Sequence, residues 1–285
     1  MNAKNLVWAM GCAAALAAAP AWAEVKWTFN FNSSTNCLGQ NATAACNFGN
    51  TRHASSVSGS PLPLPPTTDV TAQAWSNTQG SGSGPLQTAY LPAWGSSGLG
   101  VQNRDMANAP SPAPAGLGDG GDGVEGNSPE HAMDNNQRYD SILFSFDESV
   151  KLTGVEIGWS SNDSDLFVLA YTGVGSPTLA GLNYSQLTAN GWDLIGNYFD
   201  LATNSKKTVN ESGVSANHWL IGTGCYDQNG SGDVSLCSAG NKDYVKLLAV
   251  YTTPGDNKVP EPASALLFAI AGAGLWRFRA ARRGA

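Results

Sequence analysis

Short runs in which apolar and polar side chains alternate dominate the centre of this chain, and they restrict what it can fold into. Three runs follow one another closely: 141–146, Val150–Trp159 and Leu166–Tyr171. Alternation with a period of two residues predicts strands buried on one face, and the nearly all-apolar third run predicts a strand buried on both faces. Turn-forming residues at 147–149 and 160–164 predict tight connections between these strands.

The same pattern returns along much of the remaining chain. Further runs of alternating or β-branched residues lie at 25–31, 70–75, 86–94, 192–201, 218–222 and 244–253. One stretch, Tyr184–Asn190, predicts one or two helical turns, and no segment predicts an amphipathic helix longer than about three turns. Loops rich in Pro, Gly and Ser separate the runs. This organisation predicts an all-β domain, a jelly-roll-like antiparallel β-sandwich.

The N-terminus has the composition of a secretory signal peptide. Lys4 supplies a positive charge, residues 6–19 form an apolar run, and Ala21-Trp22-Ala23 fits the small-x-small pattern of a cleavage site. We therefore expect residues 1–23 to be removed and the mature chain to begin at Glu24. The alternative is an uncleaved N-terminal membrane anchor, for which the apolar run is short.

The C-terminal residues 259–285 form a second processing signal in three parts. The motif Val259-Pro260-Glu261-Pro262 is followed by an uncharged stretch from Ala263 to Trp276 and then by four arginines: Arg277, Arg279, Arg282 and Arg283. The uncharged stretch spans roughly 21 Å as a helix, against roughly 30 Å of hydrocarbon in a bilayer. We expect a short, removable transmembrane helix whose arginines keep the C-terminus in the cytoplasm. A permanent tail anchor is the alternative.

Charge limits the partners of the body between the two signals, residues 24–258. The whole chain has 15 Lys and Arg against 22 Asp and Glu, a net charge of −7, and the two ends contain five of the basic residues. No basic cluster remains in the body, which argues against a nucleic-acid partner. An acidic body that is poor in lysine suits an extracellular protein or a calcium binder.

Cysteines also indicate export. Of the five in the chain, Cys12 belongs to the predicted signal peptide, and the rest form two local pairs, Cys37 with Cys46 and Cys225 with Cys237. An even number in an exported chain predicts disulfides. Local pairing is the simplest of the three possible connectivities.

Two resemblances follow from these motifs. The C-terminal motif, apolar stretch and arginine cluster resemble the PEP-CTERM sorting signal that exosortases read in Gram-negative bacteria. The body is similar to the exosortase-dependent surface protein family through short motifs in a given order: Gly98–Val101, His131–Asn136, Tyr139–Phe146, Val155–Trp159, Asp163–Asp165, Leu169–Gly173 and Tyr244–Val250.

The resemblance implies an exported, non-enzymatic protein that is held transiently in the inner membrane. An exosortase-like membrane peptidase would process it at or near Pro260-Glu261-Pro262. Its final location would be the cell surface or the extracellular matrix, with a structural or adhesive role among exopolysaccharides in a biofilm. The resemblance brings no catalytic residue to this chain.

Calcium is the ligand that the acidic loops favour most. In the loop after Cys225, oxygen-bearing side chains occupy positions 1, 3, 5 and 7 and a glycine occupies position 6: Asp227, Asn229, Ser231, Asp233 and Gly232. This spacing lets a tight loop wrap a hard cation, although position 12 is Ser238 where an EF-hand has Glu. The alternative is a hairpin tip closed by a disulfide.

A second calcium set lies at strand ends around the central runs: Asp134, Asn135, Asp140, Asp163 and Asp165. Jelly-roll domains hold structural calcium between such loops. The alternative is a series of Asx turns, in which these side chains bind their own backbone.

Catalytic motifs are weak. The chain has three histidines, His53, His131 and His218, and it has no G-x-S-x-G, H-E-x-x-H or Walker A sequence. Residues 118–123 satisfy G-x-G-x-x-G in form, but they follow a Pro-rich loop and no helix follows them, so nucleotide binding lacks its context. We therefore expect no enzymatic activity, and a secreted hydrolase remains an alternative.

Tryptophans leave a carbohydrate-binding module as the other alternative. Five are candidates for sugar stacking: Trp75, Trp94, Trp159, Trp192 and Trp219. Most lie in alternating runs, where packing in the core is the favoured role. Trp94, beside Gly95, is the one most expected to be exposed.

Overall fold

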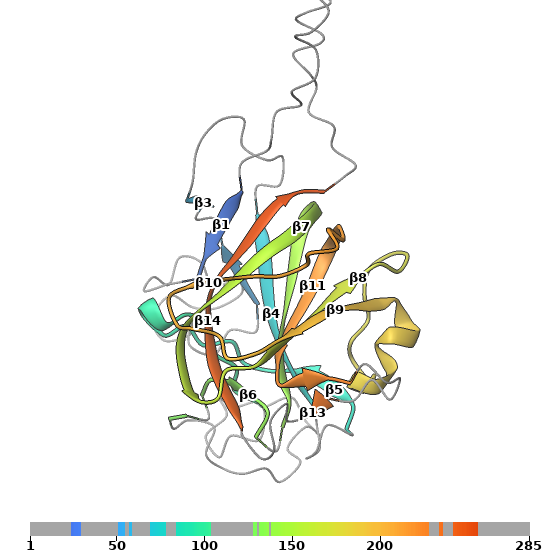
Figure 1. Ribbon diagram of the computed structural model, residues 1–285. Helices are drawn as coiled ribbons and strands as arrows, with labels where there is room; N and C mark the ends of the chain where they lie inside the picture. The colour runs from blue at the N-terminus through green and yellow to red at the C-terminus, as the bar shows by residue number, and fades with distance from the viewer. Residues whose placement is uncertain are drawn as a thin grey trace, which may run out of the picture. The chain divides into compact units, whose positions relative to one another are not determined.

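The computed structural model (Figure 1) describes residues 24–29, 51–54, 57–58, 69–77, 84–103, 128–129, 131–136, 138–227, 234–235 and 242–255. These residues belong to one compact unit, Ala23–Asp256. The predicted signal peptide and sorting tail lie outside the described residues. Within the described ranges, no helix has the length and apolar character needed to cross a bilayer.

The described part of the chain is all-β, as the sequence predicts, and its strand ladders are antiparallel. The strands are β1 (Val25–Thr28), β2 (Thr51–Ala54), β3 (Val57–Ser58), β4 (Val70–Asn77), β5 (Leu86–Thr88), β6 (Met133–Asp134), β7 (Asp140–Asn162), β8 (Leu166–Tyr171), β9 (Trp192–Tyr198), β10 (Lys206–Thr208), β11 (Ala216–Thr223), β12 (Cys225–Tyr226), β13 (Val234–Ser235) and β14 (Asp243–Pro254). Among the residues described, the helical segments are single 3-10 turns: η4 (Gly95–Ser97), η5 (Tyr184–Gln186) and η6 (Thr188–Asn190).

The 23-residue strand β7 organises the sheet because it has different neighbours along its length. Residues 140–146 pair with β4 on one side and β11 on the other, whereas residues 150–162 pair with β14, and 154–156 with β10. The turn expected at 147–149 is therefore wrong. The residues that flank this segment are paired, which keeps the backbone extended. Phe146 before it pairs with Val70, and Val150 after it pairs with Ala216 and with Pro254.

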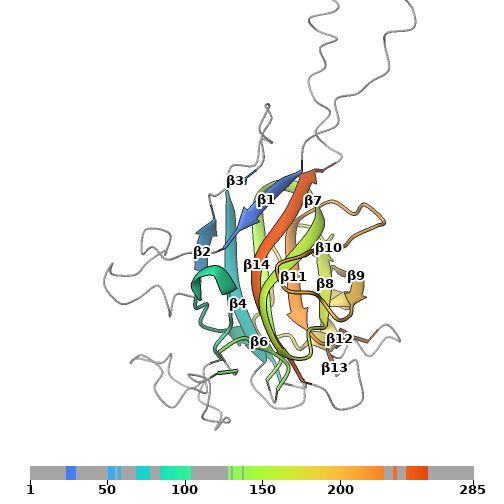
Figure 2. The ribbon, with the colours of Figure 1, turned by 60° about the vertical axis from the view of Figure 1, so that its left-hand side comes forward.

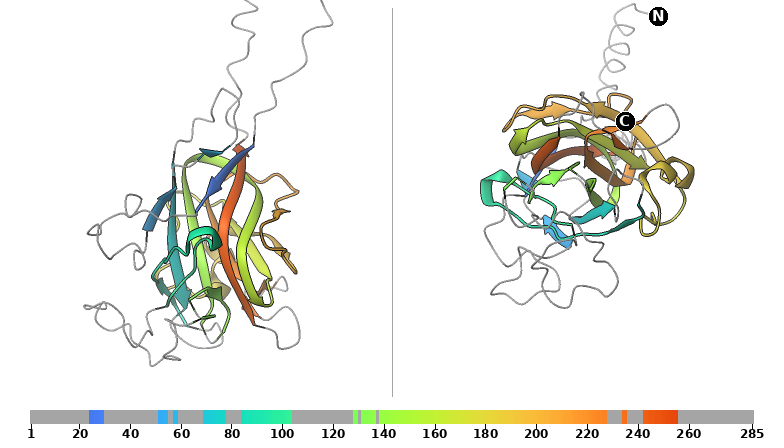
Figure 3. Two further views of the ribbon diagram at one scale, coloured as in Figure 1. Left: turned by 90° about the vertical axis from the view of Figure 1, so that its left-hand side faces the viewer. Right: turned by 90° about the horizontal axis from the view of Figure 1, so that it is seen from below.

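Two groups of strands join at β7. One group has the order β2-β4-β7-β11-β8-β9, with β5 on β4, and the other has the order β3-β1-β14-β7-β10, with β6 on β14. Both groups send apolar side chains into one main core, which includes Trp27, Phe144, Val168, Trp219 and Leu247. The strands lie around this core in the two rotated views (Figure 2, Figure 3).

A second apolar cluster covers the other face of the first group of strands. Phe167 and Leu169 on β8 point into it, whereas their neighbour Val168 points into the main core. Tyr184 and Trp192, from η5 and β9, are fully buried against them. The strand β8 is thus buried on both faces, as its apolar run predicts, because successive side chains of a strand point to opposite faces.

Candidate functional site

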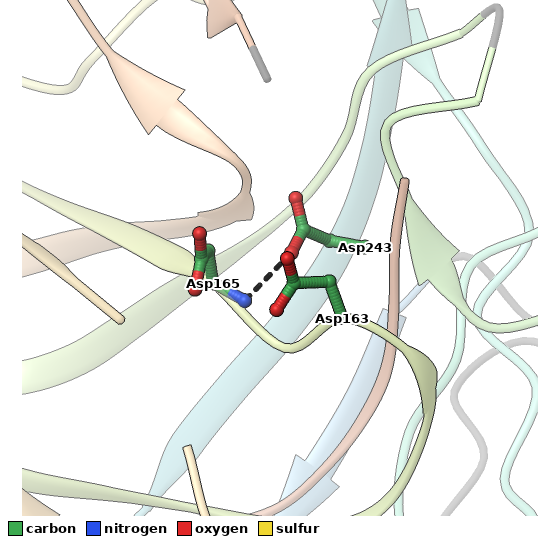
Figure 4. A group of neighbouring side chains, drawn as sticks. All are labelled: Asp163, Asp165 and Asp243. Atoms are coloured by element: carbon green, nitrogen blue, oxygen red, sulfur yellow. Dashed lines mark hydrogen bonds between the residues drawn. The ribbon is translucent and has the colours of Figure 1, made fainter. Parts of the chain in front are cut away.

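Three aspartates from three strand ends meet at one end of the β7–β14 ladder (Figure 4). Asp163 follows β7, Asp165 precedes β8, and Asp243 begins β14. An isolated parallel bridge joins Asp163 to Asp243. Asn162, with φ of 63°, lies in the left-handed region that Asn tolerates better than most residues, and it lets the chain turn between β7 and β8.

The three carboxylates are close and largely hidden from water. One oxygen from each lies within 4.8 Å of the others, and Asp165 and Asp243 are 2% and 1% exposed. Asp243 Oδ1 accepts a hydrogen bond of 2.7 Å from the backbone N–H of Asp165, drawn dashed in Figure 4. Asp165 Oδ1 accepts one of 2.9 Å from the N–H of Asp200, and Asp163 Oδ1 accepts one of 2.9 Å from that of Ser164.

Asn135 is the polar neighbour of this acidic cluster. Its Nδ2 donates to Asp243 Oδ2 at 2.7 Å, and its Oδ1 accepts from the backbone N–H of Asp243 at 2.8 Å. These two bonds tie the segment after β6 to the start of β14. Of the second calcium set, the structure thus brings Asn135, Asp163 and Asp165 together around Asp243.

The remaining two residues of that set, Asp134 and Asp140, bond to the neighbouring backbone. Asp134 Oδ1 accepts from the N–H of Asn136 at 2.8 Å, which is an Asx turn. Asp140 Oδ2 accepts from the N–H of Asp134 at 3.4 Å. Asp134 therefore has the local role that the alternative interpretation assigns to such residues.

Burial and the charges of neighbouring aspartates make Asp165 and Asp243 hard to ionise. Burial raises the pKa of Asp243 from 3.8 to about 7, and the charges of Asp165 and Asp163 act in the same direction against the hydrogen bonds from Asp165 and Asn135. Burial likewise raises the pKa of Asp165 against the hydrogen bond from the backbone N–H of Asp200, and the charges of Asp163 and Asp200 add to the rise. No lysine or arginine of the described residues contributes to either shift. Burial and the neighbouring charges therefore favour the protonated form of Asp243.

The donor set is compatible with a calcium ion. Calcium binds six to eight oxygens at about 2.3–2.6 Å, so two oxygens on one ion lie at most about 5 Å apart, and the cluster meets this limit. Asp163, Asp165 and Asp243 would each supply one oxygen. Three oxygens are fewer than the six to eight that calcium takes, so water or backbone carbonyls would have to complete the shell.

The other predicted calcium loop falls mostly outside the described residues. Asp227 is described, directly after β12, whereas Asn229, Ser231 and Asp233 are not. Cys225 is disulfide-bonded. Cys37, Cys46 and Cys237 lie outside the described ranges, as do the sorting motif and the terminal arginines, so those predictions stay as they are.

A serine and a histidine do meet, on the opposite face from the main core. His218 on β11 pairs directly with Ser145 on β7, and His218 Nδ1 lies 2.9 Å from Ser145 Oγ. Burial alone lowers the pKa of His218, and no described carboxylate contributes to the shift. A nucleophile and base need a third group that orients the base. Among the described residues this contact is a cross-strand pair without that third group.

The tryptophans distribute as the sequence predicts. Trp75, Trp192 and Trp219 lie in the two apolar clusters, while Trp94 is 37% exposed and Trp159 is half-buried. Trp94 also stacks on His131, at 4.1 Å between ring centroids. Within the described ranges the protein is all-β, with an acidic cluster at Asp163, Asp165 and Asp243 and with exposed aromatic side chains at Trp94 and Phe199.

Comparison with known proteins assigns the chain to no family. A scan against protein-family models found no match for the chain. A search of curated proteins found no match either.

Asp243 is the site residue that the sequence analysis missed. It stands directly before the apolar run that begins at Tyr244, as Asp165 stands directly before Leu166. An aspartate at the start of a strand was thus a usable signal in both places. The pairing of β14 with the end of β7, which local sequence does not reveal, is what places Asp243 beside Asp163.

Proposed function

We propose that this protein is an exported, non-enzymatic surface or extracellular-matrix protein of a Gram-negative bacterium that an exosortase-like membrane peptidase processes. The order of Val259-Pro260-Glu261-Pro262, the uncharged stretch and the terminal arginines carries this proposal. The protein is held briefly in the inner membrane by the tail and is then released or attached at the cell surface. Its role there is structural or adhesive, among the exopolysaccharides of a biofilm.

The positions of the two ends of the body support processing at both. Strand β1 begins at Val25, which pairs with Thr252 near the end of β14, and the two strands run side by side (Figure 2). Glu24, the first residue after the predicted signal-peptide cleavage site, accepts hydrogen bonds of 2.5 Å from Lys206 Nζ and Thr153 Oγ1. The folded body thus includes Glu24, the first predicted mature residue, which is bonded to Thr153 and Lys206.

We infer a jelly-roll-like sandwich as the finer description of the body, with β7 shared between its two groups of strands. In this description the acidic cluster of Asp163, Asp165 and Asp243 holds a structural calcium ion and joins three strand ends. The second candidate is a carbohydrate-binding module, which the exposure of Trp94 favours.

The test of the proposal is Glu261→Gln, with Glu211→Gln, a change of an exposed acid in the body, as the matched control. We expect Glu261→Gln to accumulate as an uncleaved precursor in the inner-membrane fraction, since the processing enzyme reads the motif. Wild type and control reach the cell exterior, and mass spectrometry finds them without Trp276 and the terminal arginines. Unchanged export of Glu261→Gln, or an exterior form that retains Trp276, contradicts the proposal.

A further inference from the structure

An aromatic clamp holds a lysine ammonium on the outer face of β14. Val245 and Leu247 point into the main core, so Lys246 between them points to the opposite face. There its Nζ lies 4.7 Å from the ring centroid of Trp94 and 4.4 Å from that of Trp159. We call these three residues, Trp94, Trp159 and Lys246, the clamp.

A β-bulge places Trp159 in the clamp. Lys246 pairs with Trp159, but the next residue, Leu247, pairs with Ile157, so Gly158 is an extra residue in β7. Ile157 points into the main core. The bulge turns Trp159 to the face that carries Lys246, since bulges redirect the side chains that follow them.

A close approach of two backbones places Trp94. The turn η4 follows Trp94 and contacts both β7 and β14; it is the blue-green coil beside β14 in Figure 3. A Cβ on Gly158 would lie 2.6 Å from the carbonyl oxygen of Ser97, so glycine permits this approach. Leu99 and Leu247 exchange two backbone hydrogen bonds of 2.8 Å. The indole is thus positioned by the backbone before any ligand arrives.

The clamp holds one positive charge that no described carboxylate balances. Lys246 is 5% exposed, and burial alone lowers its pKa to about 8. Burial, together with the charge of Lys246, lowers the pKa of His131 to about 4, so the imidazole stacked on Trp94 is neutral at pH 7. His131 Nδ1 also has no hydrogen-bond partner among the described residues. The two rings attract the ammonium, but an anion would balance its charge.

We propose that the clamp binds uronic acid units of an anionic polysaccharide, with the carboxylate on Lys246 and the sugar ring against the exposed part of Trp94. The proposal rests on the matrix role inferred above and names the chemistry of the polymer. A single carboxylate matches a single ammonium, and an indole offers an apolar surface to the C–H groups of a sugar. The body at residues 24–258 has 10 basic and 21 acidic residues, and this net charge of −11 repels a polyanion at long range, but physiological salt screens exposed charges beyond about 8 Å.

The experiment measures binding of the purified protein to polygalacturonate and to the same polymer after full methyl esterification. We expect the acidic polymer to bind and the neutral ester to bind about tenfold or more weakly, because a hydrogen bond to a charged group is lost. Lys246→Met, which keeps an unbranched side chain between the rings, and Trp94→Ala show similar losses. Lys207→Met, which removes a charge from exposed β10, is the matched control and binds like wild type.

Three results would overturn the proposal: no binding of polygalacturonate, equal binding of the ester, or wild-type binding by Lys246→Met. Equal affinity for dextran sulfate would also overturn it, since the site would then select charge and not uronate. The ester comparison uses wild-type protein, so it holds even if a variant fails to fold. Export and processing are measured separately, so a processed protein that ignores polyuronate refutes this inference alone, and a polyuronate binder whose tail is never processed refutes the proposed function alone.

Discussion

Two buried acids on the ladder between β7 and β14 have opposite surroundings. Glu156 is 6% exposed and accepts hydrogen bonds from Lys26 Nζ at 2.6 Å and from the Tyr251 hydroxyl. Asp243 is 1% exposed and faces two more carboxylates, Asp163 and Asp165. Burial acts to raise both pKa values, but the partners of Glu156 bring its pKa below the ordinary value, whereas that of Asp243 rises to about 7.

The charge of Glu156 is balanced within the fold, whereas the charges of Asp163, Asp165 and Asp243 face one another. Glu156 joins β7 to β1 and to β14 through partners present in the chain. The acidic cluster brings together the ends of β7, β8 and β14, but its carboxylates repel one another. Buried carboxylates without a cationic partner lower the stability of the fold. Among the described residues, a metal ion or a proton would therefore add most to stability at this cluster.

The largest expected effect is the pH dependence of the acidic cluster. Because the folded-state pKa of Asp243 lies above 3.8, the native state holds this proton more tightly than the unfolded state does. The cluster therefore favours folding most below about pH 4, and this contribution is lost as the pH rises to about 7, with a total of about 4 kcal/mol in the free energy of unfolding. Denaturant unfolding at pH 5 and pH 8 in EDTA measures the part of this loss that falls above pH 5, about 3 kcal/mol for a folded-state pKa of about 7.

Asp165→Asn tests the cause of this dependence. The amide retains an oxygen for the N–H of Asp200 and removes one charge beside Asp243, so the loss of stability between pH 5 and pH 8 should shrink. Asp193→Asn, at an exposed position on β9, is the matched control and should keep the wild-type slope. The same slope in both variants would contradict the role of repulsion.

A smaller effect is expected at the paired acid. Lys26→Met leaves Glu156 with the Tyr251 hydroxyl alone and should lower the free energy of unfolding at pH 7 by about 2–3 kcal/mol, less than for a fully buried pair since the Lys26 side chain is 28% exposed. The folded-state pKa of Glu156 lies below 4.5, so the pair stabilises above that pH and its contribution is lost as the pH falls through the folded value.

Unfolding of Lys26→Met and of Lys207→Met at pH 7 and pH 3 therefore distinguishes a pair from a general charge effect. The deficit of Lys26→Met should diminish at pH 3, while Lys207→Met should match wild type at both pH values. A deficit that does not change with pH would mean that Lys26 acts through packing of its stem.

The smallest effect is that of calcium. At about tenfold excess over its dissociation constant, an ion bound only by the native state adds about 1.4 kcal/mol to the free energy of unfolding. Calorimetry with calcium and with EDTA measures the shift, which should be larger at pH 8 than at pH 5 because protons compete for the carboxylates. Asp165→Asn should abolish it and Asp193→Asn should retain it. No shift at millimolar calcium in wild type removes the calcium site.

Much of the strand content follows from local pattern. The runs predicted at 70–75, 166–171 and 244–253 are confirmed as β4, β8 and β14 within two residues, and the helical turns at Tyr184–Asn190 are confirmed as η5 and η6. The period-two rule works there because one or both faces of each strand are buried. It failed at 86–94, where the strand ends at Thr88 and the backbone turns into η4 to reach β14.

By itself, the sequence determined the all-β character, the buried and exposed tryptophans and the acidic residues at strand ends, because each depends on side chains a few positions apart. The tertiary structure alone decided that β7 runs unbroken through 147–149, that Asp243 completes the acidic cluster and that Lys246 lies between two indoles. Each of these depends on which strands lie next to one another. That choice is made by burial of the whole core, where residues such as Asp163 and Asp243 become neighbours although 80 positions separate them.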